Sequence, residues 1–379
     1  MTLSLRAITA AQHADWLSGR PFTSFLQLPE WGGVKSGWRP ESVGWFESSR
    51  LVGAGLVLYR PVPRLPRRSL AYLPEGPDID WLRQSHPHLS LTDWLDPLLE
   101  HCRHAGAFQV KMGPPVALRR WEADTVKSAL AEQGDRPGRI GELLADWHSG
   151  PAAITVERLR SSGWEQEPAQ GAGFGDVQPR YVFQVPLSGR TLDDVFAGFN
   201  QLWRRNIRKA EKSGVVVAEG GRDDLAAFHR VYVETASRDH FTPRAQSYFE
   251  RMWDCLNSRE VRLRLYCAHY DGHLAAATLM VVVGRHAWYS YGASTTADRD
   301  VRPSNALQWR MIQDAHALGC DTYDLRGIAD TLDPANHLFG LVQFKLGTGG
   351  YVQEYAGEWD HVLRPLWAKG YQAYQARRG

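Results

Sequence analysis

Residues 261–283 read VRLRLYCAHYDGHLAAATLMVVV, and this stretch decides the fold class. Apolar side chains alternate with other residues from Val261 to Cys267, and a second run returns from Leu274 to Val283. Between them, Asp271-Gly272 is a dipeptide typical of a two-residue hairpin turn. The stretch therefore predicts a β-hairpin.

The same succession of elements occurs twice along the chain. After the hairpin, the pattern predicts a third strand, a helix, a glycine and a last strand at 288–293, 304–318, Gly319 and 321–325. Different residues give the same order earlier, with a hairpin over 43–59, a strand over 69–73, a helix around 94–102, Gly106 and a strand over 107–112. We therefore predict an α/β (α+β) protein with two copies of one unit, each a mixed, mainly antiparallel sheet flanked by helices. The order is similar to that of acetyltransferase-like (GNAT-like) domains, a resemblance of fold and not of function.

The composition is that of a globular protein large enough for two domains. The 379 residues are 43% hydrophobic and carry a net charge of +2, so an anionic partner must meet a local basic patch. We find no apolar run long enough for a signal peptide or a membrane span. No HExxH motif is present, and the four cysteines form no CxxC pair: Cys102, Cys255, Cys267 and Cys320. We expect neither disulfides nor a metal, as in a reduced, cytoplasmic protein.

A region with the composition of loops separates the two copies. Residues 133–152 and 165–178 are rich in Gly, Pro, Gln and Asp, and they include Gln170-Gly171-Ala172-Gly173-Phe174-Gly175. This composition predicts loops, and we expect a domain boundary within 150–180.

A single lysine precedes a glycine-rich corner near the C-terminal end. The stretch is Gln343-Phe344-Lys345-Leu346-Gly347-Thr348-Gly349-Gly350, and we expect a loop there between strands at 320–327 and 351–355. Three glycines in four residues suit a place where the backbone closely approaches another group. Lys345 could hold an anion, or an oxygen that becomes one, or it could be a solvated residue of a tight turn.

Other cations are candidates for binding anions. Lys35 would share a helical face with Trp31 and Trp38, where it could grip a phosphate or extend its stem over a packed face. A long helical pattern from Thr191 to Gly214 carries a set of cations, Arg204, Arg205, Arg208, Lys209 and Lys212. These cations form either a site for an anionic partner or a solvated face. Arg238 and Arg244 follow on a loop, as diphosphate contacts or plain surface charges.

Six stretches follow one another in a specific order over nearly the whole chain. They are Leu26 to Lys35, Arg205 to Val215, Tyr289 to Ser294, Pro303 to Trp309, Tyr323 to Ile328 and Phe344 to Gly350. Together they resemble the FemABX family, which transfers amino acids from aminoacyl-tRNA onto peptidoglycan precursors. Each stretch alone is a weak signal, whereas the ordered set is specific.

The resemblance implies two GNAT-like domains. Residues 1–165, completed by the C-terminal segment 330–379, would bind the precursor, and residues 166–329 would face the tRNA. No long heptad pattern interrupts the second domain, so the chain resembles the short members that lack a coiled-coil arm. The turn Pro74-Glu75-Gly76-Pro77 departs from the family, because Glu75 stands where a basic residue is common. Substrate contacts at this turn are therefore in doubt.

The resemblance also implies an activity. A small amino acid would move from aminoacyl-tRNA to the side-chain amine of the third stem-peptide residue of UDP-MurNAc-pentapeptide or lipid II. Amine attack on the ester builds an oxyanion, which Lys345 would stabilise while Phe344 packs on the terminal adenosine. The basic helix would bind tRNA, and precursor binding would fall to Lys35, Arg238, Arg244, Tyr289 and Tyr291. The resemblance implies no cofactor, no DNA partner and at most peripheral membrane contact.

Two other classes of function remain open. An acyl-CoA-dependent N-acyltransferase of the same fold would need a glycine turn that binds pyrophosphate at the start of a helix. We find no such turn before the helix at 304 or the one at 90. A non-catalytic protein that binds RNA or the precursor would use the basic helix but leave Lys345 without a role. Co-purification of charged tRNA or of CoA would separate the three classes.

Overall fold

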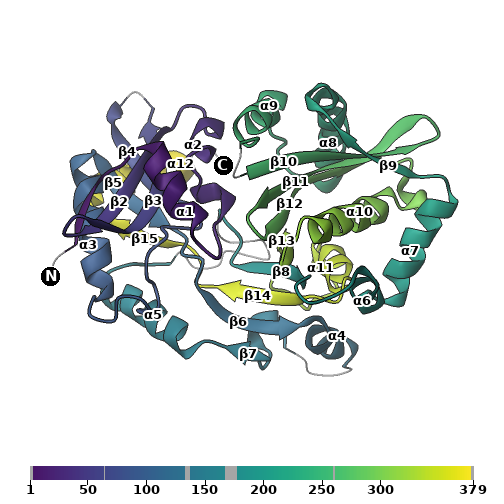
Figure 1. Cartoon of the computed structure of the whole chain (residues 1–379), viewed down its shortest axis with the longest axis horizontal. Coiled ribbons are helices and arrows are strands. Elements are labelled where there is room, and N and C mark those ends of the chain that lie inside the picture. Colours follow the sequence, from purple (N-terminus) through teal and green to yellow (C-terminus); the bar gives the residue numbers. More distant parts are fainter. Residues whose placement is uncertain (1–2, 64, 133–136, 167–176, 259–260, 377–379) are drawn as a thin grey trace. The chain divides into compact units, whose positions relative to one another are not determined.

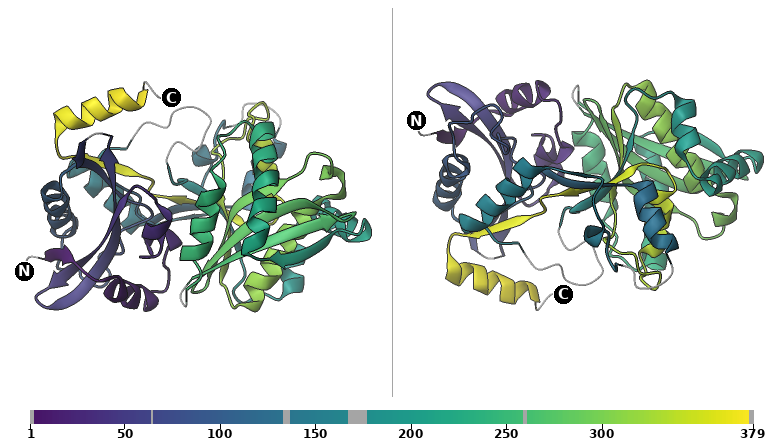
Figure 2. Two further views of the ribbon diagram at one scale, coloured as in Figure 1. Left: turned by 90° about the horizontal axis from the view of Figure 1, so that it is seen from above. Right: turned by 90° about the horizontal axis from the view of Figure 1, so that it is seen from below.

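The computed structural model describes residues 3–63, 65–132, 137–166, 177–258 and 261–376. The chain divides into two compact units, each assembled from more than one segment. Unit 1 contains residues 1–119, 147–180 and 354–379, and unit 2 contains residues 120–146 and 181–353. Figure 1 labels the elements, and Figure 2 shows them from two further sides. No helix in the described part of the chain is long and apolar enough to cross a membrane.

Unit 1 is built on a six-stranded sheet with the strand order β1-β2-β3-β4-β5-β15. The strands are β1 (Ser4–Ala7), β2 (Arg39–Glu47), β3 (Arg50–Val62), β4 (Leu65–Leu73), β5 (Ala107–Met112) and β15 (Trp359–Val362). The helices are α1 (Ala10–Ser18), α2 (Trp31–Val34), α3 (Leu91–His104), α5 (Gly150–Ser161) and α12 (Pro365–Ala376). The core joins the sheet to α3 and α5 around the buried Trp45, Trp94 and Trp359.

The strands of a second sheet, in the order β7-β6-β14-β8-β13-β12-β11-β10-β9, belong to unit 2 except for β7, which belongs to unit 1. They are β6 (Ala117–Glu122), β7 (Trp147–His148), β8 (Tyr181–Pro186), β9 (Val216–Gly220), β10 (Val261–Tyr270), β11 (His273–Val283), β12 (His286–Ser294), β13 (Thr322–Gly327) and β14 (Tyr351–Tyr355). The helices are α4 (Ala123–Ala131), α6 (Leu192–Gly198), α7 (Gln201–Lys212), α8 (Leu225–Asp239), α9 (Gln246–Cys255), α10 (Pro303–Ala317) and α11 (Phe339–Leu346). The boundaries between the units fall within β6 and β14 and at residues 146 and 180.

The predicted repeat is present in both units. In unit 1, β2, β3 and β4 form an antiparallel meander, and α3 leads to β5, which pairs in parallel with β4. In unit 2, β10, β11 and β12 form the meander, and α10 leads to β13, which pairs in parallel with β12. Gly106 and Gly319 follow the two helices with φ values of +89° and +75°, the left-handed conformation that glycine adopts without strain. The predicted fold class is therefore confirmed.

The division into units differs from the predicted boundaries in three segments, the first of which is 166–180, predicted in the second domain but assigned to unit 1. Residues 120–146 belong to unit 2, because Trp121 and Ile140 are buried in its core. Residues 330–353 also belong to unit 2, since Val342 packs in the same core. From residue 354 onward the chain returns to unit 1, where β15 pairs with β5.

The region predicted as loops between the copies is only partly described. Gln170 to Gly175 lie outside the described residues. Within 133–152, a short 3₁₀ turn covers Ile140–Glu142, and α5 begins at Gly150. Ser149 caps this helix by accepting a hydrogen bond from the Ala152 main-chain nitrogen, so the helix starts earlier than the composition indicated.

Two other stretches differ from their predicted form. The single helical pattern from Thr191 is two helices, α6 and α7, because Phe199 and Asn200 are extended and Asn200 caps the second helix. Residues 343–346, predicted as loop, form the last turn of α11, and the glycines begin only after Leu346. Val342 and Leu346 lie one turn apart and are both buried, which explains the helix.

Candidate functional site

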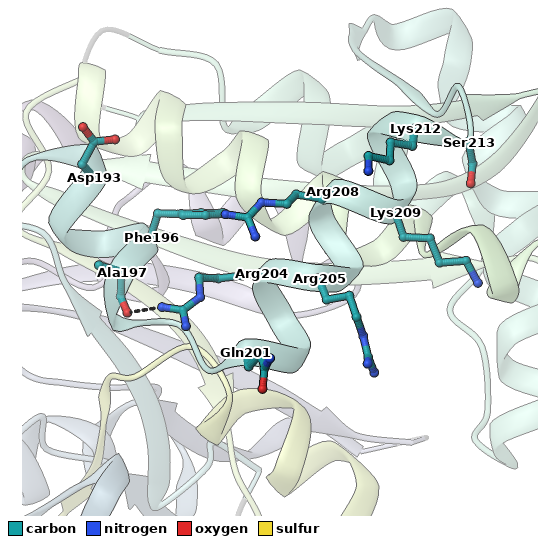
Figure 3. A pocket seen from close by; sticks show the side chains of 10 residues that line it. All are labelled: Asp193, Phe196, Ala197, Gln201, Arg204, Arg205, Arg208, Lys209, Lys212 and Ser213. Atoms are coloured by element: carbon teal, nitrogen blue, oxygen red, sulfur yellow. Dashed lines mark hydrogen bonds between the residues drawn. The ribbon is translucent and has the colours of Figure 1, made fainter.

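An open groove along α7 gathers the five cations predicted to bind tRNA. Asn200 Oδ1 accepts a hydrogen bond from the Trp203 main-chain nitrogen at 2.9 Å and so caps the helix. Trp203 and Ile207 bury one face of α7 in the core, which leaves the cations on the remaining faces. The groove has a volume of about 920 Å³ and is lined by Asp193, Phe196, Ala197, Gln201, Arg204, Arg205, Arg208, Lys209, Lys212 and Ser213 (Figure 3).

The groove is strongly positive. Asp193 is the one carboxylate among its lining residues, and none of the five cations forms an ion pair with a described residue. The Arg204 guanidinium donates a hydrogen bond to the Ala197 carbonyl oxygen at 2.8 Å. The Arg208 guanidinium lies 5.6 Å from the centre of the Phe196 ring (Figure 3). These contacts orient two of the cations in advance, which favours binding of a polyanion.

Lys345 lies in the last turn of α11 and is only 3% exposed. Its ammonium donates hydrogen bonds to the main-chain carbonyl oxygens of Leu325 (2.8 Å), Arg326 (3.3 Å) and Gly327. These carbonyls converge because Arg326 has a φ of +60°, a left-handed conformation that is uncommon for a residue other than glycine. The interpretation of Lys345 as a solvated turn residue is therefore wrong, because its charge is enclosed by backbone oxygens.

A buried carboxylate supports this lysine site. Asp324 Oδ1 accepts a hydrogen bond from the Arg326 main-chain nitrogen at 2.5 Å, which fixes the turn that supplies the carbonyls. Asp324 Oδ2 accepts a hydrogen bond from Gln184 at 2.9 Å and lies 3.4 Å from His286 Nε2. Burial lowers the pKa of Lys345 to about 7, against the opposing effect of the Asp324 charge. The amine and ammonium forms of Lys345 are therefore both populated near neutral pH.

Phe344 and the glycine corner pack against other parts of unit 2. The Phe344 ring centre lies 4.6 Å from that of Trp203, and the Trp203 indole donates a hydrogen bond to the Phe344 carbonyl at 2.7 Å. A Cβ atom on Gly347 would lie 2.2 Å from the same indole, and one on Gly349 would lie 2.1 Å from the Gly198 carbonyl oxygen. The close approach predicted for these glycines is confirmed, and the approaching groups are the end of α6 and the side chain of Trp203.

The precursor-binding residues predicted in unit 2 lie in more than one environment. Tyr291 Oη lies 3.0 Å from Tyr248 Oη, and the Arg244 guanidinium lies 4.7 Å from the centre of the Tyr248 ring. Tyr289 instead packs against the core, and burial raises its pKa to about 12. The bulge in β12 between Tyr289 and Tyr291 explains this difference, because one extra residue turns the next side chain to the other face of the sheet.

Two charged residues from the sequence analysis are engaged by their neighbours. Arg238 forms an ion pair with Asp239 at 2.9 Å and donates a hydrogen bond to the Ser294 carbonyl at 2.8 Å. Glu75 stands where a basic residue is common in the FemABX family, and it accepts a hydrogen bond from Ser24 Oγ at 2.5 Å. Both contacts hold local structure, and diphosphate binding by Arg238 stays a prediction.

Lys35 lies directly after α2, a helix of a single turn. Its ammonium is 5.0 Å from the centre of the Trp31 ring, which is a cation–π distance. The predicted helical face shared with Trp38 does not form, because the helix ends at Val34 and Gly37 has a φ of +77°. Lys35 belongs to unit 1 whereas Arg238 and Arg244 belong to unit 2, so their joint binding of a diphosphate stays a prediction.

Sequence reasoning did not assign a role to Asp324 or Tyr248. A carboxylate in the middle of an apolar strand was a signal for Asp324, because such a group must be partnered when it is buried. Tyr248 gave no local signal, because its hydrogen-bonding partner Tyr291 is 43 residues away along the chain. Within the described residues, no group of three or more His, Cys, Asp or Glu side chains could hold a metal ion.

Solved structures show the same fold. A crystal structure of FemX matches with a TM-score of 0.76 and 21% identity, over 96% of this chain and 99% of the other. A tandem GNAT protein from the clavulanic acid biosynthesis pathway matches with a TM-score of 0.52 and 13% identity, over 95% and 98% of the two chains. At these identities the likeness shows the fold alone, and it supports the prediction of two GNAT-like parts.

Sequence comparisons identify the family. Lipid II:glycine glycyltransferases of Staphylococcus saprophyticus and Staphylococcus epidermidis are both 24% identical to this chain, over 95% of it and 93% of their own length. The enzyme of the same name from Staphylococcus aureus is 23% identical over the same shares. A sequence model of the FemAB family matches residues 8–270 and 267–376, nearly the whole chain. The chain therefore belongs to the FemAB family.

Proposed function

We propose that this chain moves an amino acid from aminoacyl-tRNA to an amine of a peptidoglycan precursor. Its class is that of a transferase, as the FemAB family and the glycyltransferase names of its relatives indicate. Those relatives act on lipid II by name, which supports a peptidoglycan precursor as the acceptor. The proposal adds the donor, the size of the amino acid, which we expect to be small, and the acceptor position, the side-chain amine of the third stem-peptide residue.

The basic groove on α7 is the observation that carries the tRNA donor. A row of phosphates requires several cations along one direction, and Arg204, Arg208 and Lys212 follow at successive steps of four residues. Arg205 and Lys209 extend the charge to the neighbouring face of the helix. A precursor with a single diphosphate needs fewer contacts, so a groove with five cations suits an acceptor stem better.

Lys345 and Phe344 are the proposed catalytic residues. Attack of the acceptor amine on the aminoacyl ester forms a tetrahedral oxyanion, whose charge a fixed cation stabilises more than it stabilises the ester. All three donors of Lys345 are engaged by carbonyls, so this role requires one of these hydrogen bonds to exchange for the oxyanion. Phe344 is half-buried with its ring against Trp203, and the proposal gives its remaining surface to the terminal adenosine.

The acceptor would be held by Lys35 in unit 1 and by Arg238, Arg244, Tyr289 and Tyr291 in unit 2. Arg244 and Tyr291 are the best supported of these, because both contact the Tyr248 side chain and, together with Tyr248, offer a cation and two hydroxyl groups. A guanidinium beside phenol hydroxyls can bind a phosphate or a carboxylate of the precursor. Tyr289, which is half-buried against the core, has the weakest support.

The rival CoA-dependent reaction would need a free helix N-terminus for the CoA pyrophosphate. At α3 that position is closed, because Ser90 and Asp93 form a capping box and the Asp93 carboxylate would repel an anion. At α10, Pro303 occupies the first turn and has no N–H group to offer. These observations favour aminoacyl-tRNA over acyl-CoA as the donor.

The test is a transfer assay with purified protein. Radiolabelled aminoacyl-tRNAs, each charged with one small amino acid, are incubated with UDP-MurNAc-pentapeptide or with lipid II, and acetyl-CoA serves as the rival donor. We expect label on the third stem-peptide residue from a charged tRNA, and slower transfer in a variant with Arg204 and Arg208 replaced by Ala. Transfer from acetyl-CoA, or no transfer from any charged tRNA to either acceptor, would reject the proposal.

A further inference from the structure

The C-terminal helix α12 forms one side of a surface on unit 1 that has no role in the reaction described above. The Tyr371 ring lies 5.1 Å from the Phe108 ring of β5, and Ala368 is buried, so the helix is docked on the unit. Just before the helix, Arg364 donates a hydrogen bond to the Arg103 carbonyl at the end of α3. Figure 2 shows α12 in yellow, close to the C-terminus.

Large apolar side chains of this surface face solvent. Leu366 is 87% exposed and Trp367 is 39% exposed, on the first turn of α12. Leu65, at the start of β4, is 44% exposed. The Arg68 guanidinium of β4 lies 5.4 Å from the centre of the Trp367 ring, which brings the two elements together. We call Leu65, Arg67, Arg68, Arg103, Leu366, Trp367 and Lys369 the basic–apolar surface.

The charge on this surface has one sign. The chain as a whole is nearly balanced, with 44 Lys and Arg against 42 Asp and Glu. The three segments that contribute its residues, 51–74, 101–121 and 361–379, contain no Asp or Glu, and the exposed Glu100 of α3 stands just before the second of them. Arg67, Arg103 and Lys369 are exposed, and no cation of the surface forms an ion pair with a described residue. Such segregation in a balanced chain indicates an anionic partner.

We propose that the basic–apolar surface docks this protein on an anionic lipid bilayer. Leu and Trp that insert at the headgroup boundary, among Lys and Arg that contact anionic headgroups, are the side chains that interfacial binding requires. An RNA would use the cations but not Leu366, because an isolated aliphatic side chain offers an RNA neither stacking nor charge. Leu366 protrudes from the first turn of α12, so an acidic protein partner would need a groove of its own that fits this side chain. A bilayer needs no such fit.

The role of membrane docking in the reaction rests on the proposed function. A lipid-linked acceptor is confined to a membrane surface, and a docked transferase would search for it in two dimensions. The inference therefore favours the lipid-linked form over the soluble nucleotide form as the acceptor on which this surface matters. Binding to vesicles can nevertheless be measured without any transfer activity, so the two proposals can fail separately.

The experiment measures binding of the full-length protein to sedimenting vesicles of phosphatidylglycerol and phosphatidylcholine, and to vesicles of phosphatidylcholine alone. We expect binding to the anionic vesicles and little to the neutral ones. Each cation near such a surface contributes about fivefold in affinity, so replacing Arg67 and Lys369 by Gln should weaken binding by about 25-fold. Leu366→Glu should weaken it at least tenfold, because it removes the exposed apolar side chain and adds a repelled charge.

Leu144→Glu is the matched control, because Leu144 is 92% exposed in unit 2, outside this surface, and its replacement should leave vesicle binding unchanged. Circular dichroism melts check that each variant is folded. With the soluble nucleotide precursor, Leu366→Glu should transfer at the wild-type rate, whereas with lipid II in anionic vesicles it should be slower. Equal binding of wild type, Leu366→Glu and the Arg67/Lys369 variant, or no binding to anionic vesicles, would overturn the inference. Loss of transfer with both acceptors would count against it as well, by indicating a general defect.

Discussion

Replacing Lys345 by Met should remove a rise in stability that the wild-type protein shows between pH 7 and pH 9. Burial lowers the pKa of Lys345 from 10.5 to about 7 in the folded protein. Between these two values the unfolded chain binds more protons than the folded one, so the free energy of unfolding rises with pH. Below the window both states are protonated and above it both are neutral, so the slope disappears on either side.

The magnitude follows from the shifted pKa. A group that binds one proton more in the unfolded state adds about 1.4 kcal/mol of stability per pH unit. Lys345 is half protonated near pH 7 in the folded protein, so its contribution between pH 7 and pH 9 amounts to about 2 kcal/mol. Met keeps an unbranched apolar stem, one heavy atom shorter than Lys, and lacks the titrating group. It also leaves the carbonyls of Leu325, Arg326 and Gly327 without their donor, which should cost roughly 1–3 kcal/mol.

The assay is urea unfolding of wild type, Lys345→Met and Lys212→Met at pH 7, 8 and 9. Lys212 is exposed on α7, so its variant should follow the wild-type pH dependence and controls for the loss of one lysine. The stability difference between wild type and Lys345→Met should widen by about 2 kcal/mol across the series. A constant difference would show that folded Lys345 does not titrate near neutral pH, and it would refute the reasoning from its burial.

Four further outcomes are expected. Replacing Arg204 and Arg208 by Ala should reduce the salt dependence of tRNA affinity by about one unit of log–log slope per cation, measured by filter binding at several salt concentrations. Lys35→Met should weaken calorimetric binding of UDP-MurNAc-pentapeptide without changing the melting temperature, and unchanged affinity would remove Lys35 from the site. In single-turnover kinetics at saturating aminoacyl-tRNA, Lys345→Met should lower the transfer rate by ~10²–10³. A defect that vanishes at saturation would limit Lys345 to binding the tRNA end. Gly350→Ala should lower the urea midpoint clearly, because its Cβ would lie 2.0 Å from the Gln184 carbonyl oxygen, and an unchanged midpoint would contradict that close packing.

The elements of the repeat could be predicted because their signals are local. The hairpin at 261–283 needs only alternation and the Asp271-Gly272 turn, and both lie within one stretch of sequence. The observed strands β10 and β11 extend the predicted ones by no more than a few residues, and β5 matches its prediction. The left-handed Gly106 and Gly319 could be predicted for the same reason, since each directly follows the last turn of a helix.

The state of Lys345 could not be predicted, because its partners are distant. The carbonyls that accept its hydrogen bonds are 18 to 20 residues earlier in the chain. They converge through the left-handed Arg326, which Asp324 holds and no local pattern indicates. Neither interpretation in the sequence analysis, an anion-binding or a solvated Lys345, placed backbone oxygens around the ammonium in place of water, because lysines are seldom buried. The tyrosines of β12 show the same limit, because a bulge separates Tyr289 from Tyr291 although their spacing of two predicts a shared face.

Trp203 connects the two parts of the candidate site in unit 2. Its indole fills the space beside Gly347, packs against the Phe344 ring at a tilt of 48° and donates a hydrogen bond to the carbonyl of that residue. Its backbone belongs to the helix with the basic groove. The contact between Trp203 and Phe344, which are 141 residues apart in sequence, therefore holds the groove and the lysine site together. Gly347 has to lack a side chain because the Trp203 indole leaves no room for one. The glycine-rich stretch thus indicated a close contact correctly, and only the three-dimensional structure identifies its partner as the helix that would carry the tRNA.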